Sequence, residues 1–353
     1  MMQDPFPRIA AMLAAEDDFD ALVRLGGLDP ATDFIGADLR HVRFGPRLDG
    51  FLLHGADLRG TNIAEVAPGY FADGTTRLPA GAILRRPADF DAAKARAMIL
   101  AGEAPPARWR PFITKLDLSD EKEFVRLASL GGCFNLRELN ISRTAVDDLA
   151  PIAGLANLQT LRLSDTKVQD LAPIAGLANL QFLYLNGTQV QDLAPIAGLA
   201  NLQYLTLVGT QVQDLAPIAG LANLQTLDLA STQVQDLAPI AGLANLQNLD
   251  LIGTQVQDLA PIAGLADLEY LWLDRTQVQD LAPIAGLANL QYLLLTGTKV
   301  QDLAPIAGLI AGGLRVDGKG DLLERLRRDA AASQARSLGA KSGSRLGGGR
   351  KGG

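Results

Sequence analysis

The sequence predicts an α/β repeat solenoid with a parallel β-sheet on its concave face, capped by a small α+β region before the array and by a helix after it. A 22-residue stretch, LQTLRLSDTKVQDLAPIAGLAN at 158–179, recurs at constant spacing. Each copy shows period-2 alternation in its first half and a helix-start signal in its second half, so the array, of about 200 residues, determines the fold. Eight full copies begin at Leu136, Leu158, Leu180, Leu202, Leu224, Leu246, Leu268 and Leu290, and a degenerate copy begins at Ile113.

Each copy, numbered from 1 to 22, has apolar residues at positions 1, 4, 6, 11, 14, 17 and 20. Positions 3 to 7 alternate, which predicts a short strand with one buried face. The following D-L-A-P-I-A-G-L combines an Asp that can cap, a Pro in the first turn, and Leu and Ile facing inward, which indicates a short helical or 3₁₀ segment. Such a unit cannot bury its apolar face alone, so the copies must stack.

The motif from Ile113 to Ala311 closely resembles the leucine-rich repeats, in the 22-residue class seen in bacterial internalins and in a regulatory subunit of protein phosphatase 1. The resemblance implies a horseshoe or arc. That family usually has an Asn at position 9 whose amide ladder holds the turn, whereas all eight copies here have Thr. Because a hydroxyl also bonds to the backbone of the turn, we expect the same fold with a thinner ladder. These residues are Thr144, Thr166, Thr188, Thr210, Thr232, Thr254, Thr276 and Thr298.

The chain divides into six parts by composition and rhythm. They are an N-terminal helix (1–28), five-residue β coils (29–66), a proline-rich helical linker and cap (67–112), the solenoid (113–318), a C-terminal cap helix (319–334) and a disordered, basic, glycine-rich tail (335–353). The coils resemble the pentapeptide-repeat proteins through Ala37-Asp38-Leu39 and Ala56-Asp57-Leu58. Fewer than two turns of such a helix fit here, so we interpret them as a small β cap that covers the sheet edge.

Composition and residue spacing limit the locations, cofactors and partners that are expected for the chain. With acidic residues near the N-terminus and no long apolar run, the chain is expected to be cytoplasmic, without a membrane partner. The resemblance to internalin-like repeats implies a bacterial protein. Cys133 is interpreted as a small buried residue rather than a reactive thiol. His41 and His54 lack metal-ligand spacing, so no cofactor or metal is expected. The basic tail predicts at most non-specific contact with nucleic acid.

Variation among the copies is concentrated at positions 3, 5, 7 and 8, on the outer face of the sheet. Every aromatic residue between Leu136 and Ala311 is at position 3 or 5, and none is in the predicted core. Neighbouring strands lie roughly 4.8 Å apart, so these side chains are expected to form two exposed clusters suited to a partner, or alternatively ladders that stabilise the sheet. They are Phe182, Tyr184, Tyr204, Tyr270, Trp272 and Tyr292.

Asp228 and Asp250 lie between the two clusters, in one column on adjacent strands. Like charges this close are unfavourable unless something compensates them, which leaves water and salt, a partner's Lys or Arg, a bound cation, or an acid/base pair as alternatives. The charged residues predicted to set register and charge preference are Arg162, Asp228, Asp250, Asp274 and Arg275.

The sequence therefore predicts a non-catalytic module that binds a protein or peptide along the concave face. One alternative is a scaffold that acts through its N-terminal cap, for which deletion of an internal copy is silent. Another is an effector enzyme of the ubiquitin-ligase kind, which needs a nucleophilic cysteine, here only Cys133.

Overall fold

The computed structural model describes residues 39–40, 87–329 and 331. The chain forms two compact units, Met1–Gln189 and Val190–Gly353, and each is described by itself. The helix predicted over 1–28, most of the five-residue coils with His41 and His54, and the basic tail lie outside the described residues and stay predictions. Of the coils, only Leu39 and Arg40 are described.

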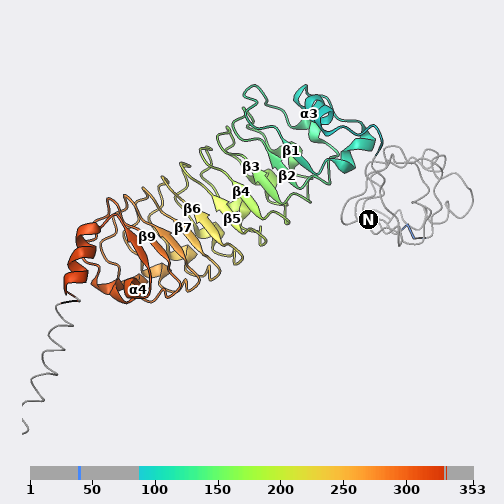
Figure 1. The fold of residues 1–353 in the computed structure, drawn as a ribbon. Coiled ribbons are helices and arrows are strands. Elements are labelled where there is room, and N and C mark those ends of the chain that lie inside the picture. Colours follow the sequence, from blue (N-terminus) through green and yellow to red (C-terminus); the bar gives the residue numbers. More distant parts are fainter. Residues whose placement is uncertain (1–38, 41–86, 330, 332–353) are drawn as a thin grey trace, which may run out of the picture. The chain divides into compact units, whose positions relative to one another are not determined.

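From residue 87 on, where the structure describes it, the first unit has α3 (Ala92–Leu100) and the 3₁₀ helix η2 (Ala107–Phe112), and then alternates strands with 3₁₀ helices. These further elements are β1 (Lys115–Asp117), η3 (Ala128–Leu130), β2 (Glu138–Asn140), η4 (Ala150–Ile152), β3 (Thr160–Arg162), η5 (Ala172–Ile174) and β4 (Phe182–Tyr184). Strands β1 to β4 pair in parallel in chain order, as Figure 1 shows.

The second unit repeats the same alternation and ends with a short α-helix, a last strand and a helical segment over 320–329. Its elements are η6 (Ala194–Ile196), β5 (Tyr204–Thr206), η7 (Ala216–Ile218), β6 (Thr226–Asp228), η8 (Ala238–Ile240), β7 (Asn248–Asp250), η9 (Ala260–Ile262), β8 (Tyr270–Trp272), η10 (Ala282–Ile284), β9 (Tyr292–Leu294), η11 (Ala304–Ile306), α4 (Ala307–Ala311) and β10 (Arg315–Asp317). Strands β5 to β10 are again parallel and in chain order. Both units confirm the predicted α/β repeat solenoid.

The core follows the repeat pattern. In the copies between Leu136 and Asn289, the residues at positions 1, 4, 6, 11, 14, 17 and 20 are at most 2% exposed. They are Leu, Ile and Val throughout, and their burial between stacked copies supplies the main stabilising free energy, about 25 cal/mol per Å² of apolar surface. In the last copy Leu309 is only half-buried, because α4 replaces the usual return.

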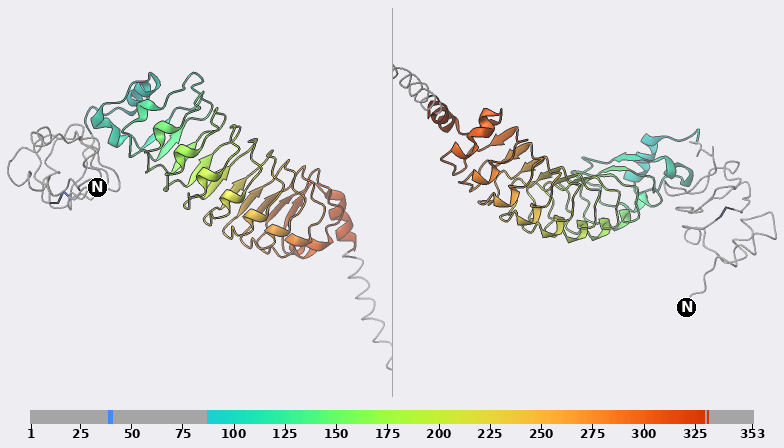
Figure 2. Two further views of the ribbon diagram at one scale, coloured as in Figure 1. Left: turned by 180° about the vertical axis from the view of Figure 1, so that it is seen from behind. Right: turned by 90° about the horizontal axis from the view of Figure 1, so that it is seen from below.

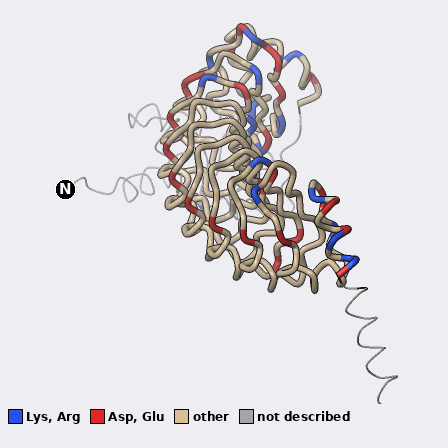
Figure 3. The backbone as a smooth tube through the Cα atoms, turned by 90° about the vertical axis from the view of Figure 1, so that its left-hand side faces the viewer, with Lys and Arg blue, Asp and Glu red and all other residues tan. Residues whose placement is uncertain are grey.

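The return segment of each copy is a 3₁₀ helix of three residues, and within each unit these helices stack along the side away from the strands (Figure 2). The aspartate at position 13 accepts a hydrogen bond from the backbone N–H of the first 3₁₀ residue, for example Asp236 from Ala238 at 2.8 Å. A proline follows in the first turn. The predicted cap and the predicted 3₁₀ segment are thus both present. Because such an aspartate recurs in each copy, acidic residues recur along the backbone tube in Figure 3.

The position-9 threonines bond to the backbone of their turns, as the sequence predicted, and a ladder between copies lies at another position. Each position-9 threonine donates to a carbonyl three residues earlier in its own copy, as Thr254 Oγ1 does to the Leu251 carbonyl at 2.7 Å. Hydrogen bonds between copies instead come from the asparagine at position 22, whose Nδ2 donates to the position-21 carbonyl of the preceding copy, as Asn223 does to Ala200 at 2.9 Å. The turn is therefore held locally, and an amide ladder exists elsewhere in the repeat.

One step of this ladder is missing. Asp267 occupies position 22 of its copy, and a carboxylate cannot donate to the Ala244 carbonyl that faces it. We expect Asp267→Asn to raise the free energy of unfolding by about 0.5–1 kcal/mol, because it restores one hydrogen bond. Chemical denaturation measures this, with Asp267→Ala as the control that lacks the donor. Equal stability of the Asn and Ala variants would contradict the prediction.

Both ends of the array depart from 22-residue spacing. Lys115 pairs with Glu138 and Tyr292 pairs with Arg315, which are 23 residues apart. At the second end the extra residue is accommodated by α4 and the Gly312-Gly313 turn, where Gly313 has φ of 112°. Such a φ strongly favours glycine. This irregular turn opens a groove, described below.

Candidate binding face

The six aromatic residues lie on strands β4, β5, β8 and β9, where each is half-buried. Within each of these four strands the central leucine points into the core, as Leu271 does between Tyr270 and Trp272. Because side chains alternate along a strand, the two flanking residues project together on the sheet face. These rings therefore have apolar surface that the solenoid itself does not cover.

In the first unit, β4 presents Phe182 and Tyr184 on either side of Leu183. The guanidinium carbon of Arg162, on the neighbouring strand, lies 4.9 Å from the centre of the Tyr184 ring. This is a cation–π contact, so Arg162 is joined to the predicted cluster through Tyr184. Phe182 and Tyr204 belong to different units, and the adjacency predicted for them stays a prediction.

In the second unit, Tyr270 pairs in register with Tyr292, as the sequence predicted. The rings of Tyr270 and Trp272 are stacked, with centroids 5.8 Å apart and an angle of 18° between their planes. Such a pair is a rigid, flat surface that loses little conformational entropy when a partner covers it.

Asp228 and Asp250 are in register on β6 and β7, and Trp272 follows Asp250 in the same column on β8. One oxygen of each aspartate is already engaged, because Asp228 accepts from the Ala230 N–H at 3.0 Å and Asp250 from the Ile252 N–H at 2.8 Å. The aspartates thus terminate their own strands, a structural role that the sequence analysis did not assign to them.

Burial raises the pKa of both carboxyl groups. The pKa of Asp228 lies above its ordinary value, chiefly because the group is withdrawn from water. The pKa of Asp250 rises to about 6 through burial and, to a smaller extent, through the charges of Asp228 and Asp274. At neutral pH the face therefore holds negative charge at a free-energy cost.

This cost predicts a pH-dependent stability. The folded-state pKa of Asp250 is above its ordinary value of 3.8, so protonation favours the folded chain. The stabilisation is complete below the unfolded-state pKa and is lost as pH rises through about 6. Asp250→Asn keeps an acceptor for the Ile252 N–H, so we expect it to remove this slope and to stabilise the fold by about 1–2 kcal/mol at pH 7. Denaturation of both proteins between pH 4 and 8 tests this; parallel curves would refute it.

Asp274 and Arg275 follow Trp272. Asp274 Oδ1 accepts from the Thr296 N–H at 2.6 Å, which ties it to the next copy. Arg275 is exposed and occupies position 8, where the backbone is left-handed in every full copy, with φ of 59° at Arg275. Four copies have glycine at this position, so part of the variation there reflects the turn rather than a partner.

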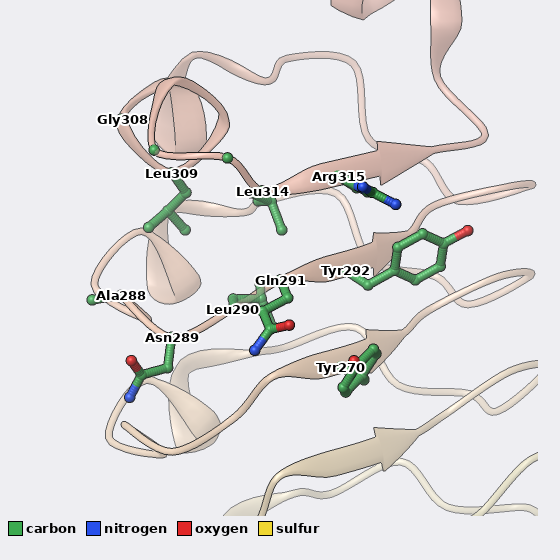
Figure 4. Close-up of a pocket in the computed structure, with 12 residues that line it drawn as sticks. Tyr270, Ala288, Asn289, Leu290, Gln291, Tyr292, Gly308, Leu309, Leu314 and Arg315 are labelled. Atoms are coloured by element: carbon green, nitrogen blue, oxygen red, sulfur yellow. The ribbon is translucent and has the colours of Figure 1, made fainter.

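The second aromatic cluster consists of Tyr270, Trp272 and Tyr292. An open groove of about 810 Å³ adjoins this cluster at the start of β8, β9 and β10 (Figure 4). Tyr292 and Arg315 project to one side of adjacent strands, with Tyr270 on the next strand. Asn289 and Gln291 bring polar atoms to it, and Leu309 and Leu314 bring apolar surface. The groove exists because α4 and the two glycines replace a regular return.

A family model described as Leucine Rich repeats (2 copies) matches residues 156–198, 178–220, 200–243 and 222–264. Internalin C2 from Listeria monocytogenes is 31% identical over 57% of this chain and 91% of that chain, with a TM-score of 0.54. The chain belongs to the leucine-rich-repeat proteins.

Other leucine-rich-repeat structures agree. An internalin (inlF) from Listeria monocytogenes is 28% identical over 64% of this chain and 68% of that chain, with a TM-score of 0.58. A leucine-rich-repeat protein from Leptospira interrogans, 21% identical over 78% of this chain and 71% of that chain, has the same fold at a TM-score of 0.55. No curated protein matches the chain. The predicted internalin-like class is therefore confirmed, and leucine-rich repeats, usually protein-interaction modules, support a binding role.

The rest of the leucine-rich-repeat chain offers few reactive groups in its described part. Cys133 is fully buried, and burial raises the pKa of its thiol to about 11, so the group is a poor nucleophile. Among the described residues, no group of three or more His, Cys, Asp or Glu side chains could hold a metal ion. No helix within 87–329 is long and apolar enough to span a bilayer.

Two features of the leucine-rich-repeat face were missed by sequence reasoning. The groove depends on the 23-residue spacing between Tyr292 and Arg315, which the double glycine at 312–313 could have signalled. The stacking of Tyr270 on Trp272 depends on side-chain rotamers, for which the repeat pattern contains no signal.

Proposed function

We propose that the chain is a non-catalytic module that binds a protein or peptide on the sheet face of its leucine-rich repeats, the face predicted to be concave. The observation that carries this is the separation of residue types. The buried interior between Leu136 and Asn289 is aliphatic, while the aromatic side chains of the array are half-buried on strands β4, β5, β8 and β9.

A solenoid stabilised by Leu, Ile and Val gains little from an aromatic residue on its surface, whereas a binding partner gains much from covering one. The groove beside Tyr270 and Tyr292 adds concave surface next to the second cluster. The second cluster and the groove, both in the second unit, together provide contacts for an extended segment of a partner. The cytoplasmic location stays a prediction from the sequence.

Affinity capture from a lysate of the source cells tests the proposal. The intact chain is compared with a triple variant, Tyr184→Ala, Tyr204→Ala and Trp272→Ala. A matched control carries three changes at exposed glutamines away from the strands, Gln213→Ala, Gln235→Ala and Gln257→Ala. We expect a protein that the intact chain and the control retain and the triple variant loses. Equal recovery by all three proteins would contradict binding through the sheet face and favour the scaffold alternative.

A further inference from the structure

The second aromatic cluster is combined with uncompensated negative charge. Asp250 precedes Trp272 in one column of adjacent strands, and Asp274 lies two residues beyond Trp272 on the same side of the chain. The flat Tyr270–Trp272 stack therefore has a carboxylate on the neighbouring strand and another just beyond the end of its own strand. This pairing of an aromatic surface with carboxylates is chemically suited to a cation.

The carboxylates retain capacity to bind. Asp250 uses one oxygen for the Ile252 N–H, and Asp274 uses one oxygen for the Thr296 N–H. Within the described residues, no lysine or arginine makes an ion pair with Asp228, Asp250 or Asp274. Asp228 has a long contact with the Thr206 hydroxyl at 3.4 Å. Asp250 is the register partner of Trp272 and Asp274 lies two residues beyond it, so these two carboxylates are the candidate acceptors.

We propose that this face recognises an extended segment of a partner protein through one arginine side chain, whose guanidinium lies against Trp272 and donates to Asp250 and Asp274. The inference rests on the function proposed above and names the chemistry of the partner. Arginine fits better than lysine, because its flat, weakly hydrated guanidinium stacks on an indole and donates to two acceptors at once.

The groove gives the rest of the segment a place to lie. Tyr270 borders it and also stacks on Trp272, so the proposed arginine site and the groove are continuous. Ala288 lines the groove at the end of the amide ladder, where position 22 of the next copy is Ala311 instead of asparagine. Its carbonyl has no ladder donor among the described residues, so a backbone N–H of the segment can donate to it.

Charge complementarity makes the proposed binding depend on pH. The charged groups around Asp250 are Asp228 on β6 and Asp274 after β8, and both carry the same sign as Asp250. Arginine stays charged at every pH of interest, whereas Asp250 attracts it electrostatically only when its carboxyl group is ionised. Because the pKa of Asp250 is about 6, affinity is expected to rise between pH 5 and pH 8.

The test uses the tryptophans of the full chain. Only Trp109 and Trp272 are present, and Trp109 is buried in the N-terminal part, so Trp109→Phe leaves Trp272 as the sole tryptophan, which is excited selectively at wavelengths where tyrosine does not absorb. The probe is an acetylated and amidated Gly/Ser peptide with a single arginine. Its matched control has citrulline, which has nearly the same shape but no charge. Both are titrated at constant ionic strength, because exposed charges are screened by salt.

We expect saturable change of Trp272 emission with the arginine peptide, about tenfold weaker binding of the citrulline peptide, and about tenfold weaker binding of arginine at pH 5 than at pH 8, in proportion to the ionised fraction of Asp250. In an Asp250→Asn background the pH dependence should disappear and the affinity should fall. Circular dichroism checks that both variants are folded.

Equal responses to the two peptides, or no saturable response of a folded protein, would overturn the inference. The capture experiment separates this failure from that of the proposed function. A partner that requires Tyr184, Tyr204 and Trp272 but is indifferent to arginine leaves the binding module intact. If the triple variant retains the captured partner as well as the intact chain does, while the arginine peptide still binds the intact chain at Trp272, the result contradicts the binding module instead.

Discussion

Replacing Tyr270 and Trp272 by threonine is expected to weaken binding of the captured partner about 100-fold, because buried aromatic residues at the centre of an interface dominate its affinity. Threonine already occupies these repeat positions elsewhere, as Thr226 on β6 and Thr206 on β5. The change therefore keeps the length, spacing and strand register of the array. We expect the free energy of unfolding to change by less than about 1 kcal/mol.

Titration calorimetry with the purified partner measures this effect. The matched control, Glu138→Thr with Asn140→Thr, makes the same kind of change on β2, a strand that lacks aromatic residues. It should leave the affinity within about twofold of the intact chain, since rim contacts contribute little. A scaffold that acts only through its N-terminal cap predicts no loss in either variant, and that result would remove the aromatic cluster from the binding site.

Gly318→Ala is expected to destabilise the C-terminal end of the solenoid by about 2–4 kcal/mol, through left-handed backbone strain and overpacking. Gly318 follows β10 with φ of 84°. A Cβ added there would lie 2.4 Å from the Thr296 backbone nitrogen and 2.7 Å from the Thr296 Cα. The obstacle is backbone of the preceding copy, which cannot move aside without breaking the contact between β9 and β10.

The neighbouring glycine supplies the control. Gly320 begins the helical segment 320–329, and a Cβ added there meets nothing within 4 Å. Gly320→Ala should therefore be neutral or slightly stabilising, since alanine favours a helix over glycine. Hydrogen exchange of β9, β10 and 320–329 distinguishes the two variants, with faster exchange expected only for Gly318→Ala. Equal protection in both would show that this turn does not hold the end of the array.

Much of the fold follows from the repeat pattern, for identifiable reasons. The apolar positions predicted as core are buried, because stacking is the only way for such short copies to remove them from water. The predicted capping aspartate and first-turn proline start each 3₁₀ helix, as at Asp236. The register of Asp228 with Asp250 and of Tyr270 with Tyr292 follows from the constant 22-residue spacing.

The differences arise where spacing alone does not determine a contact. The position-9 hydroxyl bonds to the backbone of its own turn as expected, for example at Thr254, but the asparagines that link the copies, such as Asn223, were not predicted. Asp228 and Asp250 were read only as surface charges, although each also accepts a backbone N–H at the end of its strand. In both cases the geometry of one turn decides which donor a side chain can reach.

The sequence by itself determined the leucine-rich-repeat solenoid, the aliphatic core and the six aromatic residues on the sheet face, because a strict repeat fixes which side of each copy is buried. Only the tertiary structure decided that Tyr270 stacks on Trp272, that burial raises the pKa of Asp250 to about 6, and that a groove opens beside Tyr292. These properties depend on rotamers, on withdrawal from water and on one extra residue before β10. Each is set by the packing of neighbouring copies, which a repeating pattern of residue types does not specify.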